Sequence, residues 1–143
     1  KETKVDCLDI ARTQVKKHEG LRLRMYKDSV GVWTIGYGHN LEANGISLAV
    51  AEQMFDEDLI TAALIARDFA GDAWPKLNEV RRAVLINMAF NLGNRLKFFV
   101  QTREALMNHD YKLVAERMAK SKWYSQVGNR GKELCKQMET GEL

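Results

Sequence analysis

The stretch HEGLRLRMYKDSVGVWTIGYGH, residues 18–39, decides how this chain is interpreted. A carboxylate, Glu19, stands where a helical pattern gives out, next to the helix-stopping Gly20. A second carboxylate, Asp28, follows at a hairpin turn, and the hydroxyl of Thr34 lies on the returning strand. Two carboxylates and a polar group held by a short hairpin can face one another across a cleft. Such a set of side chains can cleave a glycosidic bond by general acid–base catalysis.

At these residues the chain resembles the bacteriophage-type lysozymes, the muramidase endolysins. Their signature has the form E-G-x-x-x-x-x-Y-x-D-x-x-G-x-x-T-I-G-x-G-H, and residues 19–39 fill it without a gap. Further matches are VRRAVLINMAFNLG at 80–93, AKSKWY at 119–124 and NR at 129–130. The resemblance therefore covers nearly the whole chain, and its first motif is specific.

The resemblance implies a role for each signature residue. Glu19 would donate a proton to the leaving sugar oxygen, and Asp28 with Thr34 would place the attacking water. The family is inverting, so the water would attack opposite the leaving group. Each residue also has an ordinary alternative: a surface Glu that ends a helix, an Asp that makes a turn, and a strand Thr.

Other positions acquire expected roles only through the resemblance. Arg130 would lie against Glu19, and His39 would be structural, paired with Asp58 on the long helix. The positions that match the family's substrate cleft are Phe90, Asn91, Thr102 and Arg117. Asn91 is one methylene shorter than the Gln common in the family. Asn87, one helical turn earlier, is expected to be a core amide bonded to nearby backbone.

Local patterns predict mostly helix. Helices are expected at 5–18, 48–67, 79–92, 98–107, 111–119 and 129–139, with Thr3 and Asp6 as a capping box for the first and Ser47 as the cap of the second. Half-buried strands are expected at 21–26 and 32–37, with a third short strand at 40–43. Gly36 and Gly38 indicate backbone that bends or allows close approach. Trp123 is expected in the core, and no tryptophan is assigned to the site.

The composition of the chain argues against some classes of function. The 143 residues suit one domain, and 45% hydrophobic with 29% charged residues is ordinary for a globular protein. The net charge of +3 is spread along the chain without interleaved aromatics, which argues against nucleic acid. No apolar run approaches membrane-spanning length, so stable membrane insertion is not expected. The N-terminal residues lack the apolar core of a secretory signal, and the export route is left open.

The His and Cys residues bear on cofactors and disulfides. The three His residues lie far apart without metal-ligand spacing, so neither a metal nor another cofactor is expected. Cys7 and Cys135 lie near opposite ends of the chain. A disulfide between them and a pair of free thiols both remain open, with free thiols favoured.

The expected fold is α+β and mostly α: a lysozyme-like, two-lobed single domain over 1–143. Its parts would be a small antiparallel β-lobe at about 20–45, a bridging helix at about 48–67, and a helical lobe from about 1–19 and 68–143, with the active site in the cleft between lobes. The resemblance implies a monomeric endolysin, made in the host cytoplasm, that hydrolyses peptidoglycan glycan strands in the periplasm. A non-catalytic wall-binding module and a lytic transglycosylase are the alternatives, and a helical DNA-binding domain is a weak third.

Overall fold

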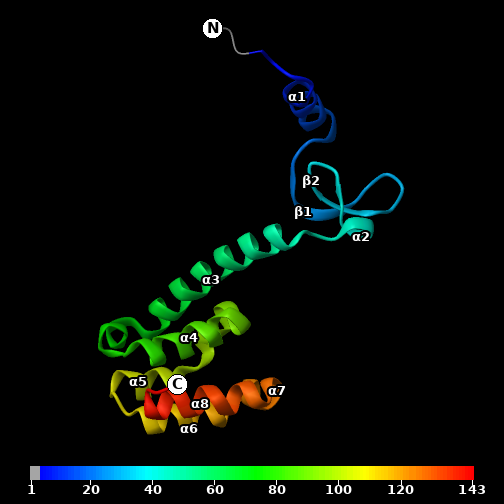
Figure 1. Ribbon diagram of the computed structural model, residues 1–143. Coiled ribbons are helices and arrows are strands. Elements are labelled where there is room, and N and C mark those ends of the chain that lie inside the picture. The colour runs from blue at the N-terminus through cyan, green and yellow to red at the C-terminus, as the bar shows by residue number, and fades with distance from the viewer. Residues whose placement is uncertain (1–3) are drawn as a thin grey trace. The chain divides into compact units, whose positions relative to one another are not determined.

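The structure is a computed structural model that describes residues 4–143, so the expected cap contribution of Thr3 lies outside the described residues. The chain divides into two compact units, Lys1–Glu52 and Gln53–Leu143. The fold is α+β and mostly helical, with a three-stranded antiparallel sheet near the N-terminus, which confirms the predicted class (Figure 1). The prediction that residues 1–19 belong to the helical lobe stays a prediction.

The first unit begins with helix α1 (Cys7–Glu19). Its N-cap is Asp6, whose side chain accepts a bond from the Asp9 amide at 2.9 Å, so the helix starts two residues later than predicted. It ends at Gly20, whose φ of 72° suits glycine and whose N–H bonds the carbonyl of Lys16. None of its residues is buried.

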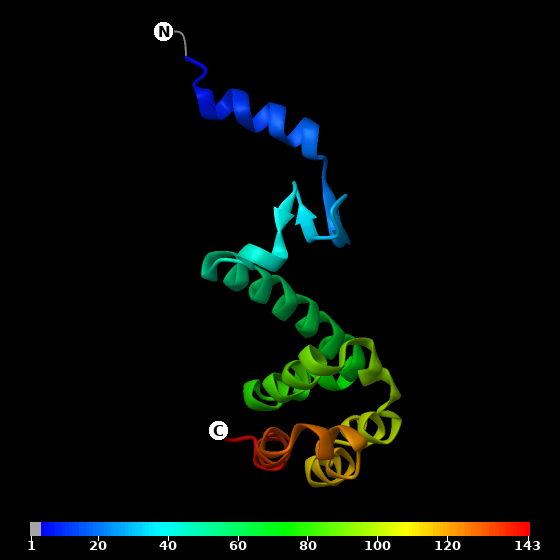
Figure 2. The same ribbon diagram turned by 90° about the vertical axis from the view of Figure 1, so that its right-hand side faces the viewer.

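The sheet consists of β1 (Arg22–Lys27), β2 (Trp33–Gly36) and β3 (His39–Asn40) in that order. The arrows of β2 and β3 lie side by side in Figure 2. The predicted third strand at 40–43 was wrong beyond its first residue. The Asn40 side chain accepts from the Ala43 amide and so starts the short helix α2 (Leu41–Asn44) instead. The prediction of a half-buried first strand was also wrong, because Leu21, Leu23 and Met25 are all exposed.

Helix α3 (Leu48–Ala70) is capped by Ser47, as predicted, since the Ser47 hydroxyl accepts from the Val50 amide at 3.2 Å. It runs three residues past the predicted end. Arg103 donates to the carbonyl of Phe69 at 3.0 Å, which satisfies a carbonyl in the extra turn. The 3-10 helix η1 (Gly71–Lys76), which contains Pro75, then ends the segment.

The second unit continues with a series of helices. They are α4 (Glu79–Leu92), the 3-10 helix η2 (Gly93–Phe98), α5 (Val100–Met107), α6 (Tyr111–Ala119), α7 (Lys122–Val127) and α8 (Asn129–Thr140). The bounds of α4 and α6 match the prediction, and α8 is one residue longer. The sequence interpretation missed η2 and α7, although Ser121 caps α7 by accepting from the Tyr124 amide. Helices α6 and α8 pack side by side (Figures 1 and 2).

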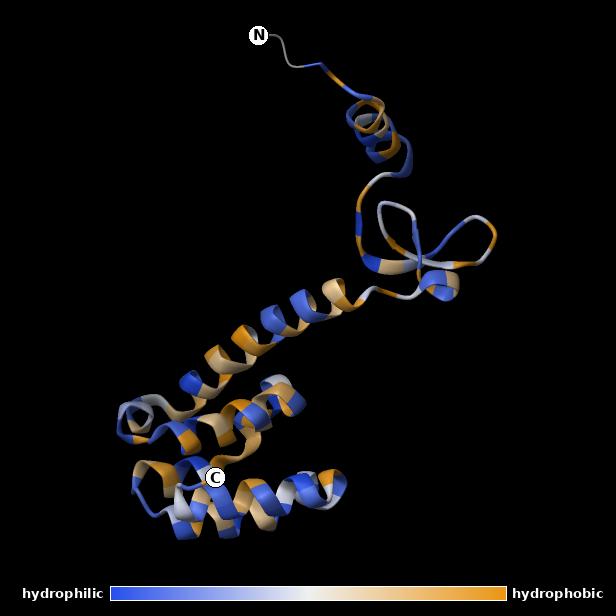
Figure 3. Ribbon diagram, in the orientation of Figure 1, coloured by the Kyte–Doolittle hydropathy of each residue, from blue (hydrophilic) through white to orange (hydrophobic). Residues whose placement is uncertain are grey.

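The core of this unit is built around α4, which buries Val84, Leu85 and Met88 completely. Trp123 is 3% exposed and belongs to the same cluster, as predicted. Burial does not extend all round α4, since Phe90 remains 41% exposed. Hydrophobic residues are conspicuous on both α3 and α4 in Figure 3.

Polar contacts join the start of α4 to the end of α8. Asn78 caps α4 by accepting from the Arg81 amide at 2.9 Å, and its Nδ2 donates to the carbonyl of Gly141 at 3.0 Å. Arg81 donates to the carbonyls of Met138 and Glu139 at 2.7 and 2.8 Å, and its guanidinium stacks on the Tyr111 ring. The start of α4 therefore satisfies carbonyls at the end of α8. Between residues 4 and 143, no helix has the length and hydrophobicity needed to cross a bilayer.

Candidate active site

Asp28 is held by the hairpin turn between β1 and β2. Its Oδ1 accepts from the amides of Val30 and Val32 at 3.0 and 2.9 Å, and its own amide donates to the Val32 carbonyl at 2.9 Å. Asp28 thus does make the turn, as its ordinary alternative predicted. Both side-chain bonds use Oδ1 and leave Oδ2 without a partner in the described part of the chain.

Thr34 lies on β2 and is 4% exposed, one of few buried polar residues. Its hydroxyl donates to the carbonyl of Val32 at 2.8 Å. In the sheet register Thr34 faces Tyr26 on β1 and Asn40 on β3, so it occupies the middle strand. Because the hydroxyl hydrogen is already used in this hydrogen bond, the Thr34 oxygen can only accept further hydrogen bonds.

Glu19 ends α1, and its side chain lies against the backbone of Gly38 in the turn between β2 and β3. A β-carbon at position 38 would overlap Glu19 Oε2 and come within 2.8 Å of Cδ. Lys16, one helical turn before Glu19, places its ammonium 5.1 Å from the centroid of the Tyr37 ring. The last turn of α1 therefore contacts the same turn that follows the Thr34 strand. The expected close approach at Gly38 is confirmed.

His39 lies on β3, with its Nε2 in hydrogen-bond contact with the carbonyl of Gly45 at the end of α2. Its predicted partner Asp58 is on α3, and their pairing stays a prediction. The sequence interpretation missed a second contact in this region. Glu42 Oε1 accepts from the Trp33 amide at 3.0 Å, which ties α2 to the strand that carries Thr34.

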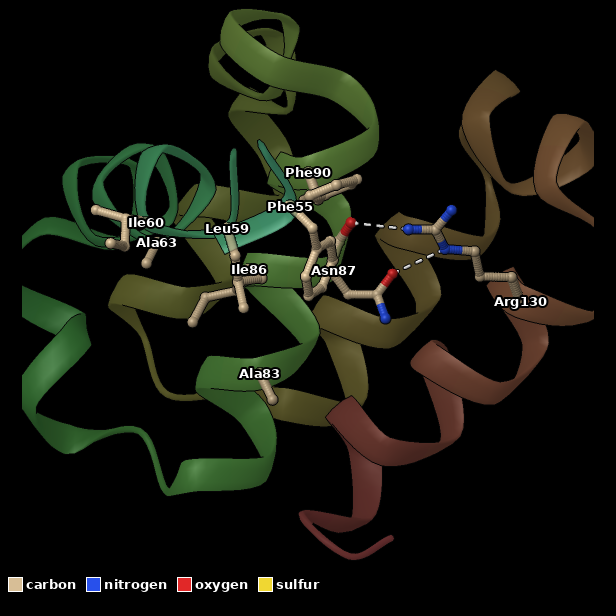
Figure 4. A pocket seen from close by; sticks show the side chains of 9 residues that line it. All are labelled: Phe55, Leu59, Ile60, Ala63, Ala83, Ile86, Asn87, Phe90 and Arg130. Atoms are coloured by element: carbon tan, nitrogen blue, oxygen red, sulfur yellow. Dashed lines mark hydrogen bonds between the residues drawn. The ribbon is translucent and has the colours of Figure 1, made fainter. Parts of the chain in front are cut away.

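Arg130, at the start of α8, binds Asn87 on α4 through two bonds (Figure 4). Its Nε donates to Asn87 Oδ1 at 2.8 Å and its Nη2 to the Asn87 carbonyl at 3.2 Å. The prediction that Asn87 is a core amide bonded to backbone was wrong. Its amide oxygen serves a side chain, because α4 presents this face to α8. The expected contact of Arg130 with Glu19 stays a prediction.

An apolar pocket of about 650 Å³ adjoins this pair, between α3 and α4. Phe90 lines it and packs on Phe55 with ring centroids 5.6 Å apart (Figure 4). The remaining lining residues are Leu59, Ile60, Ala63, Ala83, Ile86, Asn87 and Arg130. Phe90 was predicted as a substrate-cleft residue, and the structure places it at an apolar surface.

Asn91, one residue on, has a defined partner. The Trp123 indole N–H donates to Asn91 Oδ1 at 3.1 Å. Trp123 also packs edge-on against Phe99, with centroids 6.5 Å apart. The buried tryptophan therefore fixes the orientation of the Asn91 amide.

Thr102 and Arg117 are brought together by the packing of α5 on α6. Both line a pocket of about 430 Å³, and Thr102 is 2% exposed. The pocket also contains Lys120 and Ser121, which the sequence interpretation did not assign to the site. Both residues lie in the AKSKWY motif at 119–124, which could have indicated them from the sequence. Two cationic side chains at one pocket make it suited to an anionic group.

The cysteines carry free thiols, Cys7 exposed and Cys135 half-buried. Burial raises the pKa of the Cys135 thiol from 9.0 to about 11. Within residues 4–143, no group of three His, Cys, Asp or Glu side chains is placed to hold a metal ion.

Several known proteins are similar to this chain in sequence. The sequence profile of the phage lysozyme family matches residues 16–139. The chain is 26% identical to the probable T4-type lysozyme 1 of Dictyostelium discoideum, over 92% of this chain and 95% of that protein. It is 42% identical to the endolysin of Acyrthosiphon pisum secondary endosymbiont phage 1, over 55% of this chain and 54% of that one. Identity to the endolysin of Salmonella phage P22 is 33%, over 57% and 59%.

The matched range contains Glu19, Asp28 and Thr34 and extends from the last turn of α1 almost to the end of α8. These three residues are therefore inside the shared region together with the helices of the second unit. A match over most of the sequence shows that this chain belongs to the phage lysozyme family, a class of glycoside hydrolases that act on peptidoglycan.

Proposed function

We propose that this protein is an endolysin that hydrolyses the β-1,4 bond between N-acetylmuramic acid and N-acetylglucosamine, with inversion at the anomeric carbon. Two relatives carry the name endolysin, which supports a role in lysing a bacterial host. The protein would be made in the host cytoplasm and act on the wall in the periplasm as a monomer, without a cofactor.

The observation that carries the proposal is the hydrogen bonding of Asp28 and Thr34. Asp28 Oδ1 is occupied by two amides, so Oδ2 is the oxygen that would accept a proton from water. The Thr34 hydroxyl donates a hydrogen bond to the Val32 carbonyl, so its oxygen would accept one from the same water. A water that donates to both would direct its lone pair at the anomeric carbon. Asp28 would take the proton as the general base.

Glu19 would act as the general acid. It lies at the end of α1, with its carboxyl group at the turn after the strand of Thr34. Protonation of the leaving oxygen by Glu19 would accompany attack by the water, which is the division of labour between two carboxylates in inverting glycosidases. Arg130 and His39, with Asp58, would support the site without touching the reacting atoms.

Substrate contacts are proposed at two places. Phe90 and Asn91 would meet the sugars, and the pocket with Thr102 and Arg117 would bind the acidic peptide that peptidoglycan carries. The support for the second is charge, because Arg117 and Lys120 both line that pocket. Under this proposal, the cationic pocket and the apolar surface would bind different parts of the substrate.

The test is digestion of purified peptidoglycan, with proton NMR spectra recorded in the first minutes. Inversion of a β bond releases an α-configured reducing end before mutarotation. A β-configured product would contradict inversion, and a 1,6-anhydro sugar would identify a lytic transglycosylase. No product from the wild type would favour a non-catalytic wall-binding module. Glu19→Gln is the control, and it should release no new reducing ends above background.

A further inference from the structure

We propose that Gly38 is a positioning residue for the general acid: the absence of a side chain at this position creates the space in which the Glu19 carboxyl group lies. The inference rests on the proposed function for the role of Glu19. The contact itself does not depend on that role. Gly38 touches no reacting atom and would act only through Glu19.

The first support is geometric. A β-carbon at position 38 would overlap Glu19 Oε2 and lie 2.8 Å from Cδ and 3.2 Å from Cγ. Three consecutive atoms of one side chain thus border the same small volume. Alanine at this position would require the carboxyl group to move, since carbon atoms do not approach one another that closely.

The second support is the anchoring of the helix that carries Glu19. The Gly20 amide bonds the Lys16 carbonyl at 3.0 Å and closes the last turn of α1. The Lys16 ammonium lies over the Tyr37 ring, next to Gly38 in the chain. Of these two contacts, only the one between Lys16 and Tyr37 joins the helix end to the turn. A β-carbon at 38 would meet the end of the Glu19 side chain and would therefore displace that side chain first. A shift of about 1 Å in a catalytic group can cost about 100-fold in rate.

The chain supplies its own control for backbone strain. Gly36 and Gly38 have almost the same positive φ, 70° and 72°. A β-carbon at 36 would meet nothing within 4 Å, whereas one at 38 would meet Glu19. Alanine at either position therefore carries the cost of a positive φ. Only the variant at 38 also takes the space of the carboxyl group.

The experiment compares Gly36→Ala with Gly38→Ala in the full chain. Three quantities are measured: the urea midpoint of unfolding, the initial rate of reducing-end release from peptidoglycan, and the ¹³C resonance of the Glu19 side-chain carboxyl. We expect similar midpoints. We expect a rate about 100-fold lower for Gly38→Ala than for Gly36→Ala. The Glu19 resonance should move in Gly38→Ala alone.

Equal rates in the two variants, or an unmoved Glu19 resonance in Gly38→Ala, would overturn the inference. If the wild type releases no reducing ends, the proposed function is refuted. The Glu19 resonance would still test the contact between Glu19 and Gly38. If Gly38→Ala does not fold, Glu19→Asp is added to it, since the shorter side chain withdraws the carboxyl group. Recovery of the Gly36→Ala midpoint would support the contact, and no recovery would refute it.

Discussion

Asp28 and Thr34 are both bound to the main chain of a single residue, Val32. The Val32 amide donates to the Asp28 carboxylate, and the Val32 carbonyl accepts from the Thr34 hydroxyl. The same carbonyl also accepts from the Asp28 amide. The position of Val32 therefore bears on the placement of both side chains.

The two roles of Asp28, turn former and proposed base, can be separated by substitution. Asn at this position keeps an oxygen that can accept from the amides of Val30 and Val32. The free energy of unfolding of Asp28→Asn should therefore lie within about 1 kcal/mol of the wild-type value. Its wall hydrolysis should fall by roughly 100-fold or more, because the charge is lost. Asp28→Ala should lose both properties, at about 1–2 kcal/mol in stability. Urea unfolding measures the stability of each variant, and reducing-end release measures its hydrolysis. Full activity in Asp28→Asn would refute the role of Asp28 as general base.

Substitution of the proposed acid should separate activity from stability. Glu19 lies at the C-terminal end of α1, where a negative charge is unfavourable, so Glu19→Gln should melt at the same temperature or slightly higher. Its hydrolysis rate should fall roughly 100- to 10,000-fold, the usual contribution of general acid catalysis. Glu52→Gln, an exposed carboxylate on α3, is the matched control and should retain full activity. Comparable losses in both would point to a general charge effect.

Asn78 joins the start of α4 to the end of the chain, and its two bonds can be removed one at a time. Asn78→Ala loses the cap to Arg81 and the bond to Gly141, which should cost about 1–2 kcal/mol. Asn78→Asp keeps a capping oxygen and loses only the donor to Gly141. It should cost clearly less in urea denaturation. Equal destabilisation by the two substitutions would show that the cap contributes nothing.

A double-mutant cycle tests the pair formed by Arg130 and Asn87. Asn87→Ala removes the side-chain acceptor but leaves the carbonyl that Arg130 also binds. The coupling energy between Arg130→Met and Asn87→Ala should therefore be modest, about 1 kcal/mol, from one charge-assisted bond at a solvent-accessible site. Thermal or urea unfolding of the four proteins gives the value. Additive effects would mean that the bond is not maintained in solution.

The half-buried thiol of Cys135 predicts a stability change at alkaline pH. Its folded-state pKa of about 11 lies above the ordinary 9.0, because burial disfavours the thiolate. The stabilisation is complete below pH 9 and is lost as the pH rises toward 11. Unfolding free energies measured across this range should fall less steeply in Cys135→Ala. At pH 8, iodoacetamide should modify the exposed Cys7 before Cys135, and the reverse order would contradict the burial.

Helix limits could be predicted from the sequence wherever a capping residue and a glycine mark them. Asn78 and Gly93 bracket α4 at the predicted positions, and Gly20 ends α1. The errors came where a local alternative was equally available. Asn40 starts a helical turn instead of continuing a strand, because its side chain can accept from the Ala43 amide. The end of α3 depended on Arg103, which lies far along the chain.

The sequence alone determined which side chains are present at the candidate site, since the signature from Glu19 to His39 is local and its spacing on the hairpin follows from the turn. Only the tertiary structure decided their partners. Asn87 was expected to bond backbone and instead binds Arg130, and Asn91 is held by Trp123. Gly38 borders Glu19 for the same reason. Capping and turn formation involve neighbours along the chain, whereas these contacts join separate elements whose meeting depends on how the helices and strands pack.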